Sequence, residues 1–385
     1  MDASAFVFQA LNGLASASSL FLVAAGLSLI FGVTRIVNFA HGSFYMLGLY
    51  VSYSLVSELA PRWESVLGAG PAYFLALVLA ALLLGVLGGL LEMVLLRRIY
   101  QAPELFQLLA TFAVVLVLQD ATLWLWGAQD LLGPRAPGLQ GAVEILGRRF
   151  PTYDVLLMVL GPLLLCALWW LLQRTRLGLL IRAATQDREM VNALGHNPQH
   201  LFTAVFALGC ALAGLGGALQ LPREPAHLAL DMITIGDAFV VVVVGGMGSI
   251  PGAYVAALLI AQIKALCIGT VDIAGVSFAF SKFTLVAEFV VMALVLLVRP
   301  WGLLGKPLNP ARQTHIDTTP MRWLTRREQG WVWAAWLCLA LWPWGVSDNS
   351  YGLVLAIDVC VAVLFAASLH LLLGPPAFLS FVPPP

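Results

Sequence analysis

The chain has 385 residues, of which 61% are hydrophobic and 10% are charged, with a mean hydropathy of +0.92 and a formal net charge of zero. Soluble proteins average about 45–50% apolar and about 25% charged residues, so this composition excludes a soluble globular domain and predicts a polytopic membrane protein, with the lipid bilayer as a partner. A net charge of zero provides no field that would attract nucleic acid, and no nucleic-acid partner is expected.

A helix needs about 20 mainly apolar residues to cross a membrane. Open sheet edges cannot be satisfied in lipid and the apolar runs lack the alternation of a barrel, so we expect helices. The predicted fold class is all-α: a polytopic transmembrane helical bundle of about eight helices plus a re-entrant broken element, with two extra C-terminal helices. The expected spans are 13–33, 36–57, 66–91, 105–127, 155–173, 201–222, 238–263, 283–298, 329–347 and 350–374.

Residues 31–44, FGVTRIVNFAHGSF, place polar groups between the first two spans. Asn38 and His41 stand where a membrane segment ordinarily carries no polar side chain, and Gly32 and Gly42 bracket them. Helix ends at membrane depth leave N–H and C=O groups free, so Asn38, His41 and Gly42 are candidates for lining a passage for a polar solute. The alternative is an interhelical polar contact beside small residues that permit close packing.

Basic residues cluster after three of the expected spans, and the positive-inside rule places all three clusters in the cytoplasm. Two crossings separate the first cluster from the second. Three apolar runs separate the second from the third, so one of these runs cannot cross as a single helix. The clusters are Arg97 and Arg98; Arg174, Arg176, Arg182 and Arg188; and Arg299, Lys306, Arg312, Arg322, Arg326 and Arg327.

Residues 175–200, TRLGLLIRAATQDREMVNALGHNPQH, are the longest polar interruption on the basic side. The pattern predicts a short helix from Arg182 to Leu194, ended by Gly195 as a C-cap and by the following Pro198. Such an amphipathic helix either lies on the lipid surface or docks in a groove of a partner.

No metal site and no cofactor is expected. The five cysteines lie singly in apolar runs without a C-x-x-C spacing, which is typical of packing residues. His196 and His200 have a metal-like spacing, but Pro198 between them breaks the helix that would align them.

The run 238–263 has a break at its centre, GGMGSIPG, residues 245–252. Paired glycines and a proline interrupt a helix, so we predict two short half-helices that enter and leave on the same side, which restores the parity of the crossings. Broken backbone at membrane depth is tolerated where it is buried or lines a cavity, and close packing through small residues is the alternative. The residues assigned to the pathway here are Gly245, Gly246, Gly248, Ser249 and Gly252.

Several of these segments resemble the permease subunits of branched-chain amino acid ABC importers. GLSLIFGVTRIVNFAHGSFYMLGLY is similar to the N-terminal pattern of that family, and VVVVVGGMGSIPGAYVAALL is similar to its late glycine-rich pattern. RLGLLIRAATQDREMVNALGHNP resembles its cytoplasmic coupling loop, and LLVRPWGLLGKP its usual C-terminal end. The resemblance covers about residues 6–308.

The resemblance implies a transmembrane permease subunit that moves leucine, isoleucine and valine into the cytoplasm across a bacterial plasma (inner) membrane. The implied partners are ABC ATPase subunits that drive transport, a second permease subunit and a periplasmic substrate-binding protein. Gly305-Lys306 is followed by Pro307, which does not complete a phosphate-binding loop, so the chain is not expected to be an enzyme. The alternatives are the same architecture importing urea or short amides, and a secondary transporter or channel.

In such importers a coupling helix sits in a cleft of the ATPase, and the resemblance maps this role onto Ala183 to Gly195. The general loop pattern Glu-Ala-Ala-x-x-x-Gly is not literal here, because Arg182 precedes the two alanines and the glycine arrives late. The residues assigned to coupling are Arg182, Ala183, Ala184, Asp187, Ala193, Leu194 and Gly195.

The tail contains a second partial resemblance. A shift of 342 positions aligns Gly32 with Gly374 and Phe39 with Phe381, so the tail resembles the opening of the second permease of the same importer, fused behind the first. The alternative is a membrane anchor with chance similarity. The expected domains are a permease transmembrane domain at 1–308, a cytoplasmic linker at 309–330 and an incomplete second permease-like segment at 331–385.

Overall fold

The computed structural model describes residues 3–305, except 36, 101, 103, 146, 187, 196, 268–269, 274–275 and 280–283, together with short pieces between 330 and 368. Contacts divide the chain into two units, Met1–Leu308 and Asn309–Pro385. The expected linker and most of the second permease-like segment lie outside the described residues, so those assignments stay predictions.

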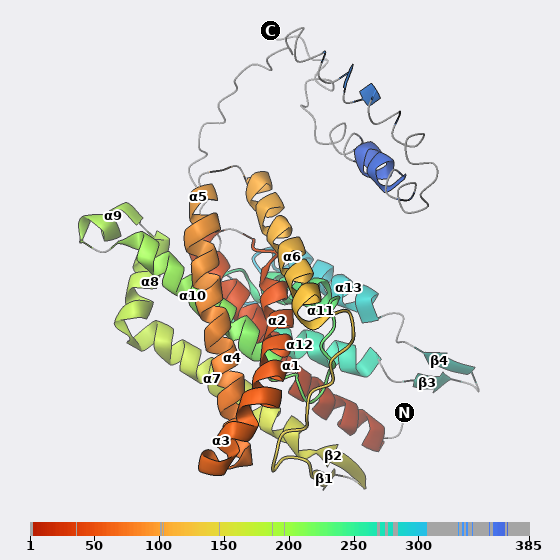
Figure 1. The fold of residues 1–385 in the computed structure, drawn as a ribbon. Helices are drawn as coiled ribbons and strands as arrows, with labels where there is room; N and C mark the ends of the chain where they lie inside the picture. Colours follow the sequence, from red (N-terminus) through yellow and green to blue (C-terminus); the bar gives the residue numbers. More distant parts are fainter. Residues whose placement is uncertain are drawn as a thin grey trace. The chain divides into compact units, whose positions relative to one another are not determined.

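Within its described residues, the first unit is a helical bundle with two small β-hairpins (Figure 1). The all-α fold class is confirmed, because helices make up the entire bundle. The helices are α1 (Ala3–Thr34), α2 (His41–Ser54), η1 (Leu55–Leu59), α3 (Ala60–Leu67), α4 (Ala69–Leu91), η2 (Glu92–Leu96), α5 (Arg97–Ile99), α6 (Glu104–Trp126), α7 (Thr152–Arg174), α8 (Arg176–Gln186), α9 (Arg188–Ala193), α10 (Pro198–Ala218), α11 (Leu230–Gly245), α12 (Ile250–Cys267) and α13 (Thr284–Val298).

Six helical segments among the described residues are long and apolar enough to cross a membrane, so the chain is a multi-pass membrane protein. Their burial differs: the most apolar window of α1 is 78% buried and that of α10 is 67% buried, against 22% for α6 and 17% for α7. Helices α1 and α10 therefore form the centre of the unit, while α6 and α7 present most of their surface outward. The six segments are Ser4–Thr34, Ala69–Ile99, Phe106–Trp126, Thr152–Arg174, Pro198–Ala218 and Ile250–Cys267.

Helix α1 packs along α12 in the antiparallel direction. Near the start of α1, Gln262 Nε2 of α12 donates a hydrogen bond to the carbonyl oxygen of Ala10 at 2.8 Å. Further along, Phe21 packs edge to face on Tyr254, with ring centroids 5.1 Å apart. The start of α1 therefore lies beside the end of α12.

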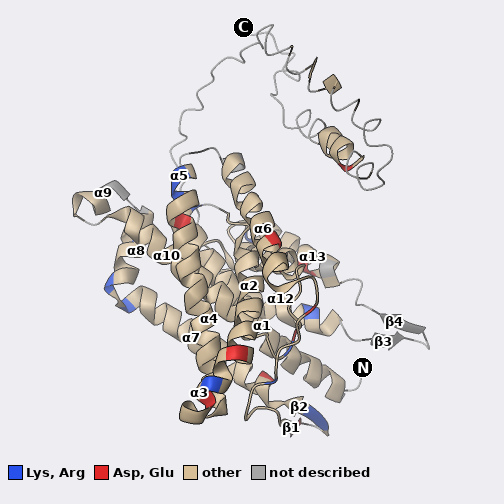
Figure 2. Ribbon diagram, in the orientation of Figure 1, with Lys and Arg blue, Asp and Glu red and all other residues tan. Residues whose placement is uncertain are grey.

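The first two basic clusters lie at the same end of the bundle. Helix α7 starts beside the start of α1, where Phe150 packs on Phe8 with ring centroids 5.5 Å apart. Helix α4 finishes beside the start of α10, where Thr203 Oγ1 donates to Glu92 Oε2 at 2.6 Å, and α10 follows the α8–α9 segment that continues α7. Figure 2 shows the corresponding basic residues at α5 and at the junction of α7 and α8, and others on α3 and β2 at different places.

The glycine-rich run is broken, as predicted. Helix α11 ends at Gly245, α12 begins at Ile250, and the two pack as an antiparallel hairpin. At about 1.5 Å per residue, their 16 and 18 residues extend about 24 and 27 Å. The arms are therefore longer than the expected short half-helices, and of the two only α12 is among the segments long and apolar enough to cross a membrane.

Two expected boundaries are also corrected. Helix α1 begins at Ala3 instead of residue 13, and the second span begins at His41 instead of residue 36. The chain reverses before α2, where Arg35 has a φ of 59° and Asn38 Oδ1 accepts from Ala40 N at 3.1 Å.

The sequence analysis did not predict the two hairpins. Strands β1 (Ala142–Ile145) and β2 (Arg148–Pro151) pair antiparallel, with Val143 opposite Phe150. Strands β3 (Thr270–Ile273) and β4 (Val276–Ala279) pair in the same way, with Val271 opposite Phe278. Both hairpins are connections between helices, and neither lies in the helical core.

Candidate functional site

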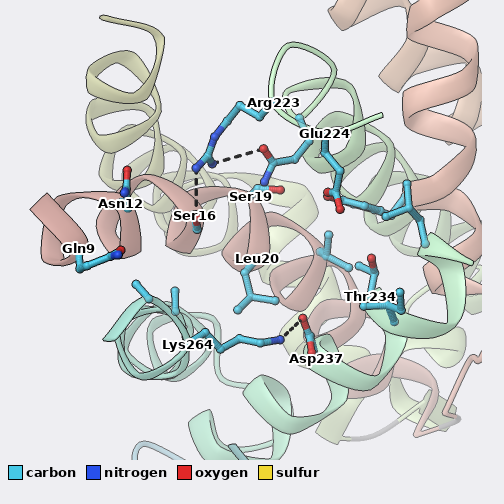
Figure 3. Close-up of a pocket in the computed structure, with 17 residues that line it drawn as sticks. Gln9, Asn12, Ser16, Ser19, Leu20, Arg223, Glu224, Thr234, Asp237 and Lys264 are labelled. Atoms are coloured by element: carbon cyan, nitrogen blue, oxygen red, sulfur yellow. Dashed lines mark hydrogen bonds and ion pairs between the residues drawn. The ribbon is translucent and has the colours of Figure 1, made fainter. Parts of the chain in front are cut away.

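A cavity of about 640 Å³ lies between residues 9–23 of α1, the loop after α10, the first half of α11 and the end of α12 (Figure 3). This volume is within the range of about 300–1,000 Å³ that small-molecule sites occupy. The cavity is lined by polar, charged and apolar side chains, which come from segments far apart in the sequence.

Helix α1 supplies a polar stripe to the cavity wall. Gln9, Asn12, Ser16 and Ser19 all line the cavity, and their spacings of three, four and three residues place them on one face of a helix. The stripe was not predicted, because the expected first span began at residue 13 and left out Gln9 and Asn12. The signal that would have found it is the recurrence of polar residues at helical spacing within an apolar helix.

Arg223, in the loop after α10, is held by three partners at one side of the cavity. Its Nε lies 3.0 Å from Asp154 Oδ1 on α7. Its Nη2 donates to Ser16 Oγ on α1 at 3.2 Å, and its Nη1 donates to Gln220 Oε1 at 3.3 Å. The guanidinium therefore joins two helices and the loop, and its position is fixed before any ligand binds.

Lys264 occupies the opposite side of the cavity. Its Nζ lies 2.5 Å from Asp237 Oδ2 on α11 and 3.2 Å from Glu288 Oε2 on α13. One ammonium group thus pairs with two carboxylates from two helices. Asp237 and Lys264 were not predicted as site residues, because they directly flank the uncharged run 238–263.

Glu224 is the lining carboxylate that has no ion-pair partner among the described residues. Figure 3 shows its side chain directed into the cavity, on the same side as Arg223. Burial raises the pKa of this carboxyl above its ordinary value, because desolvation disfavours the charged form. In and directly behind the wall, four carboxylates face two cations, a formal charge of −2: Asp154, Glu224, Asp237 and Glu288 against Arg223 and Lys264.

The rest of the wall is largely apolar. Tyr45 adds an aromatic ring from α2, and the remaining apolar members are Leu20, Val23, Leu230, Ile233, Ala261 and Ala265. A site with fixed charges of both signs beside aliphatic side chains can bind a small solute that carries charged groups at one end and hydrocarbon at the other.

The predicted pathway residues directly before and at the start of α2 lie outside this lining. His41 is fully buried, and its Nε2 lies 2.9 Å from the carbonyl oxygen of Val23 on α1. Asn38 is buried beside it. Gly42 lies so close to the backbone of Asp231 on α11 that a Cβ would collide with it. These three residues make helix contacts, and their assignment to a solute route stays a prediction.

The predicted pathway residues of the glycine break are also in backbone contacts and do not line the cavity. A Cβ on Gly245 or Gly252 would collide with the backbone of the other, and Gly252 N donates to Ser249 Oγ at 3.2 Å. Gly246 and Gly248 have φ values of 102° and 84°, which L side chains rarely adopt. The break is therefore a tight turn between α11 and α12.

The turn is closed by the segment after α13. Leu303 N donates to the carbonyl oxygen of Val244 at 2.8 Å, and Leu304 N donates to that of Gly245 at 3.1 Å. These bonds satisfy carbonyl groups at the end of α11, which would otherwise lack partners. They also bring Arg299, the described member of the third basic cluster, to the hairpin tip.

The predicted coupling residues fall on two helices. The structure describes α8 up to Gln186 and α9 from Arg188, and Asp187 between them lies outside the described residues. The others are placed as follows: Arg182, Ala183 and Ala184 on α8, Ala193 at the end of α9, and Leu194 and Gly195 directly after it.

The end of the coupling segment matches the predicted cap. Gly195 has a φ of 84°, and α10 then begins with Asn197 Oδ1 accepting from Gln199 N at 2.9 Å. Ala184 is buried, whereas Leu194 is 71% exposed. Gly195 borders a groove of about 450 Å³ between the α8–α9 segment and α10.

Comparison with known proteins gives a consistent result. A family model described as the permease component of branched-chain amino acid transport systems matches residues 9–299. The high-affinity branched-chain amino acid transport system permease protein BraD of Pseudomonas aeruginosa is 29% identical over 307 residues, which cover 78% of this chain and 96% of BraD.

Two further relatives come from a bacterium and an archaeon. The corresponding permease protein LivH of Escherichia coli K12 is 27% identical over 309 residues, which cover 78% of this chain and 96% of LivH. A probable branched-chain amino acid transport permease protein LivH of Methanocaldococcus jannaschii is 26% identical over 302 residues, covering 74% of this chain and 88% of that protein. No solved structure matches the chain.

Proposed function

Because the chain belongs to the family of branched-chain amino acid transport permease components, we propose that it forms the membrane path of an ABC importer for leucine, isoleucine and valine. A permease component of this kind is not itself an enzyme, so the energy for transport comes from separate ATPase subunits. The observation that carries the proposal is the family match over residues 9–299, which includes the whole lining of the cavity.

The orientation of the helices supports a direction of transport. Helix α5, which follows α4 and η2, and the end of α7 carry basic residues, which the positive-inside rule assigns to the cytoplasm. The cavity lies beside the start of α1 and the end of α12, nearer the opposite end of the bundle. A solute delivered from outside by a periplasmic binding protein would therefore reach this cavity first.

The remaining partners follow from the family. An ATPase would contact the α8–α9 segment, because its last residues include an exposed leucine, Leu194, next to the groove that Gly195 borders. A second permease subunit would complete the transmembrane pair. We place the complex in a bacterial inner membrane, in keeping with the bacterial relatives.

Uptake into proteoliposomes tests the proposal. Vesicles would contain this chain with the second permease, the ATPases and the binding protein of the same system, and radiolabelled leucine would be supplied outside. We expect uptake that requires ATP and that a proton or sodium gradient cannot drive. Gradient-driven uptake without the ATPases would instead support a secondary transporter.

The same vesicles distinguish the substrate classes. Urea and short amides lack the separated positive and negative charges that the wall of the cavity can pair. We therefore expect leucine to be taken up in preference to urea or acetamide, and uptake of urea without leucine would contradict the proposed substrate.

A further inference from the structure

The charges around the cavity are not equivalent. Lys264 has its ammonium balanced by Asp237 and Glu288. Arg223 pairs with a single carboxylate, Asp154, and Glu224 has no ion-pair partner among the described residues. Arg223 and Glu224 can therefore still form ion pairs with a ligand. They are consecutive in one loop and line the same side of the cavity.

We propose that Arg223 and Glu224 together bind the charged end of a free zwitterionic amino acid. The Glu224 carboxylate accepts hydrogen bonds from the α-ammonium group, and the Arg223 guanidinium donates to the α-carboxylate. This inference rests on the proposed function and assigns residues of this chain to the recognition of its substrate class.

Arg223 has donors left for a ligand. A guanidinium carries five N–H groups, and the described contacts with Asp154, Ser16 and Gln220 engage three of them. The same contacts fix the guanidinium, so little side-chain entropy remains to be lost when a carboxylate binds. The contacts with α7, with α1 and within the loop thus hold the guanidinium in place for a ligand.

Glu224 matches an ammonium group for a complementary reason. The formal charge of −2 in and behind the wall favours a cation, and within the lining Glu224 is the carboxylate with which no described lysine or arginine forms an ion pair. Thr234 lies on the neighbouring part of the wall and offers a hydroxyl oxygen as a further acceptor. An ammonium group here regains the hydrogen bonds that it leaves behind in water.

The apolar wall receives the other end of the ligand. Leu20, Val23 and Ile233 line the same cavity, and burying an aliphatic side chain against them is favourable because it removes apolar surface from water. A site built in this way distinguishes an amino acid from a fatty acid, which leaves Glu224 without a partner, and from a short amide, which leaves both charged groups without one.

Competition binding on the purified importer complex tests the inference without depending on transport. The probes are leucine, 4-methylpentanoate, which lacks the ammonium group, and leucinol, which lacks the carboxylate. We expect the wild type to bind leucine at least tenfold more tightly than either analogue. In Glu224→Gln the affinity for leucine should fall about 10- to 100-fold, and the preference for leucine over 4-methylpentanoate should disappear.

Two further variants control for folding. Glu64→Gln makes the same change at a glutamate on α3 that is exposed and does not line the cavity, so its affinities should equal those of the wild type. Glu224→Asp keeps the charge and should retain the preference for leucine over 4-methylpentanoate with a smaller loss of affinity.

The outcomes separate this inference from the proposed function. Unchanged affinity and unchanged preference in Glu224→Gln would overturn the inference, and so would a wild-type complex that binds no leucine. If the wild type binds leucine with the expected preference but shows no ATP-dependent uptake, the inference stands and the proposed function falls. If uptake is ATP-dependent and equal in Glu224→Gln and wild type, the function stands and the inference falls.

Discussion

Lys264 of α12 lies 2.5 Å from Asp237 of α11, so an ion pair joins the two arms of the glycine-broken hairpin. Glu288 of α13, at 3.2 Å from the same Nζ, extends the contact to a third helix. The hairpin is therefore held at both ends: by the glycine turn and Leu303 at its tip, and by Lys264 near its open end.

Replacing Lys264 by methionine should destabilise the bundle. The change leaves Asp237 and Glu288 close together without their cation. Removing one partner of a fully buried ion pair costs about 3–5 kcal/mol, but the Lys264 side chain is 24% exposed, so we expect a loss of about 1–3 kcal/mol in the free energy of unfolding. Denaturation of the purified protein in detergent measures it.

The double variant Lys264→Met/Glu288→Gln is the matched control. It removes one of the two uncompensated carboxylates and should recover part of the lost stability. Equal stability of Lys264→Met and wild type would show that the ion pairs contribute nothing.

Leucine binding should weaken on acidification. Burial raises the pKa of Glu224, Asp237 raises it further, and His227 and Arg223 lower it. The carboxylate therefore takes up a proton at a higher pH than an exposed glutamate, and the neutral acid no longer attracts an ammonium group. Affinities measured between about pH 8 and pH 5 should fall in the wild type. The same pH profile in Glu224→Gln would contradict this prediction.

Two glycine-to-alanine substitutions should have different effects on the free energy of unfolding. A Cβ on Gly42 would collide with the backbone of Asp231, whereas one on Gly236 meets nothing within 4 Å. Gly42→Ala should cost about 1–3 kcal/mol through overpacking. Gly236→Ala lies within helix α11 and should be neutral or stabilising by up to about 1 kcal/mol. Thermal unfolding of both variants measures the difference, and equal midpoints would contradict the described contact between α2 and α11.

The α8–α9 segment should carry the contact with the ATPase. Leu194 is 71% exposed, so Leu194→Asp should leave the fold intact and reduce the amount of ATPase that co-purifies by tenfold or more, because an unpaired charge opposes docking. Leu132→Asp changes a leucine that is 75% exposed in a segment outside α8 and α9, and it should have no such effect. Equal loss in both variants would exclude a specific contact at Leu194.

Much of the fold could be predicted from short stretches of sequence. The apolar runs, the break at residues 245–252 and the cap at Gly195 all follow from hydrophobic transfer and from the backbone limits of glycine and proline, which are properties of a few neighbouring residues. The predicted helix boundaries were less accurate. Helix α1 begins at Ala3, because packing against α12 and α7 stabilises its first turns, which the apolar pattern alone does not predict.

The candidate site could not be predicted in the same way. Gln9 and Lys264 are separated by most of the first unit, and they reach one cavity because α1 and α12 run antiparallel. Conversely, the polar residues Asn38 and His41 stand out in the sequence, yet they lie in buried helix contacts. A polar residue in an apolar run indicates that protein shields it from lipid, but not which partner does so.

The sequence by itself determined that this chain crosses a membrane many times, that its late helix is broken, and that its basic residues gather between particular spans. Only the tertiary structure decided which polar side chains meet in a cavity. The reason is that solvation acts on each residue separately, whereas a cavity depends on which helix faces pack together and which are left apart.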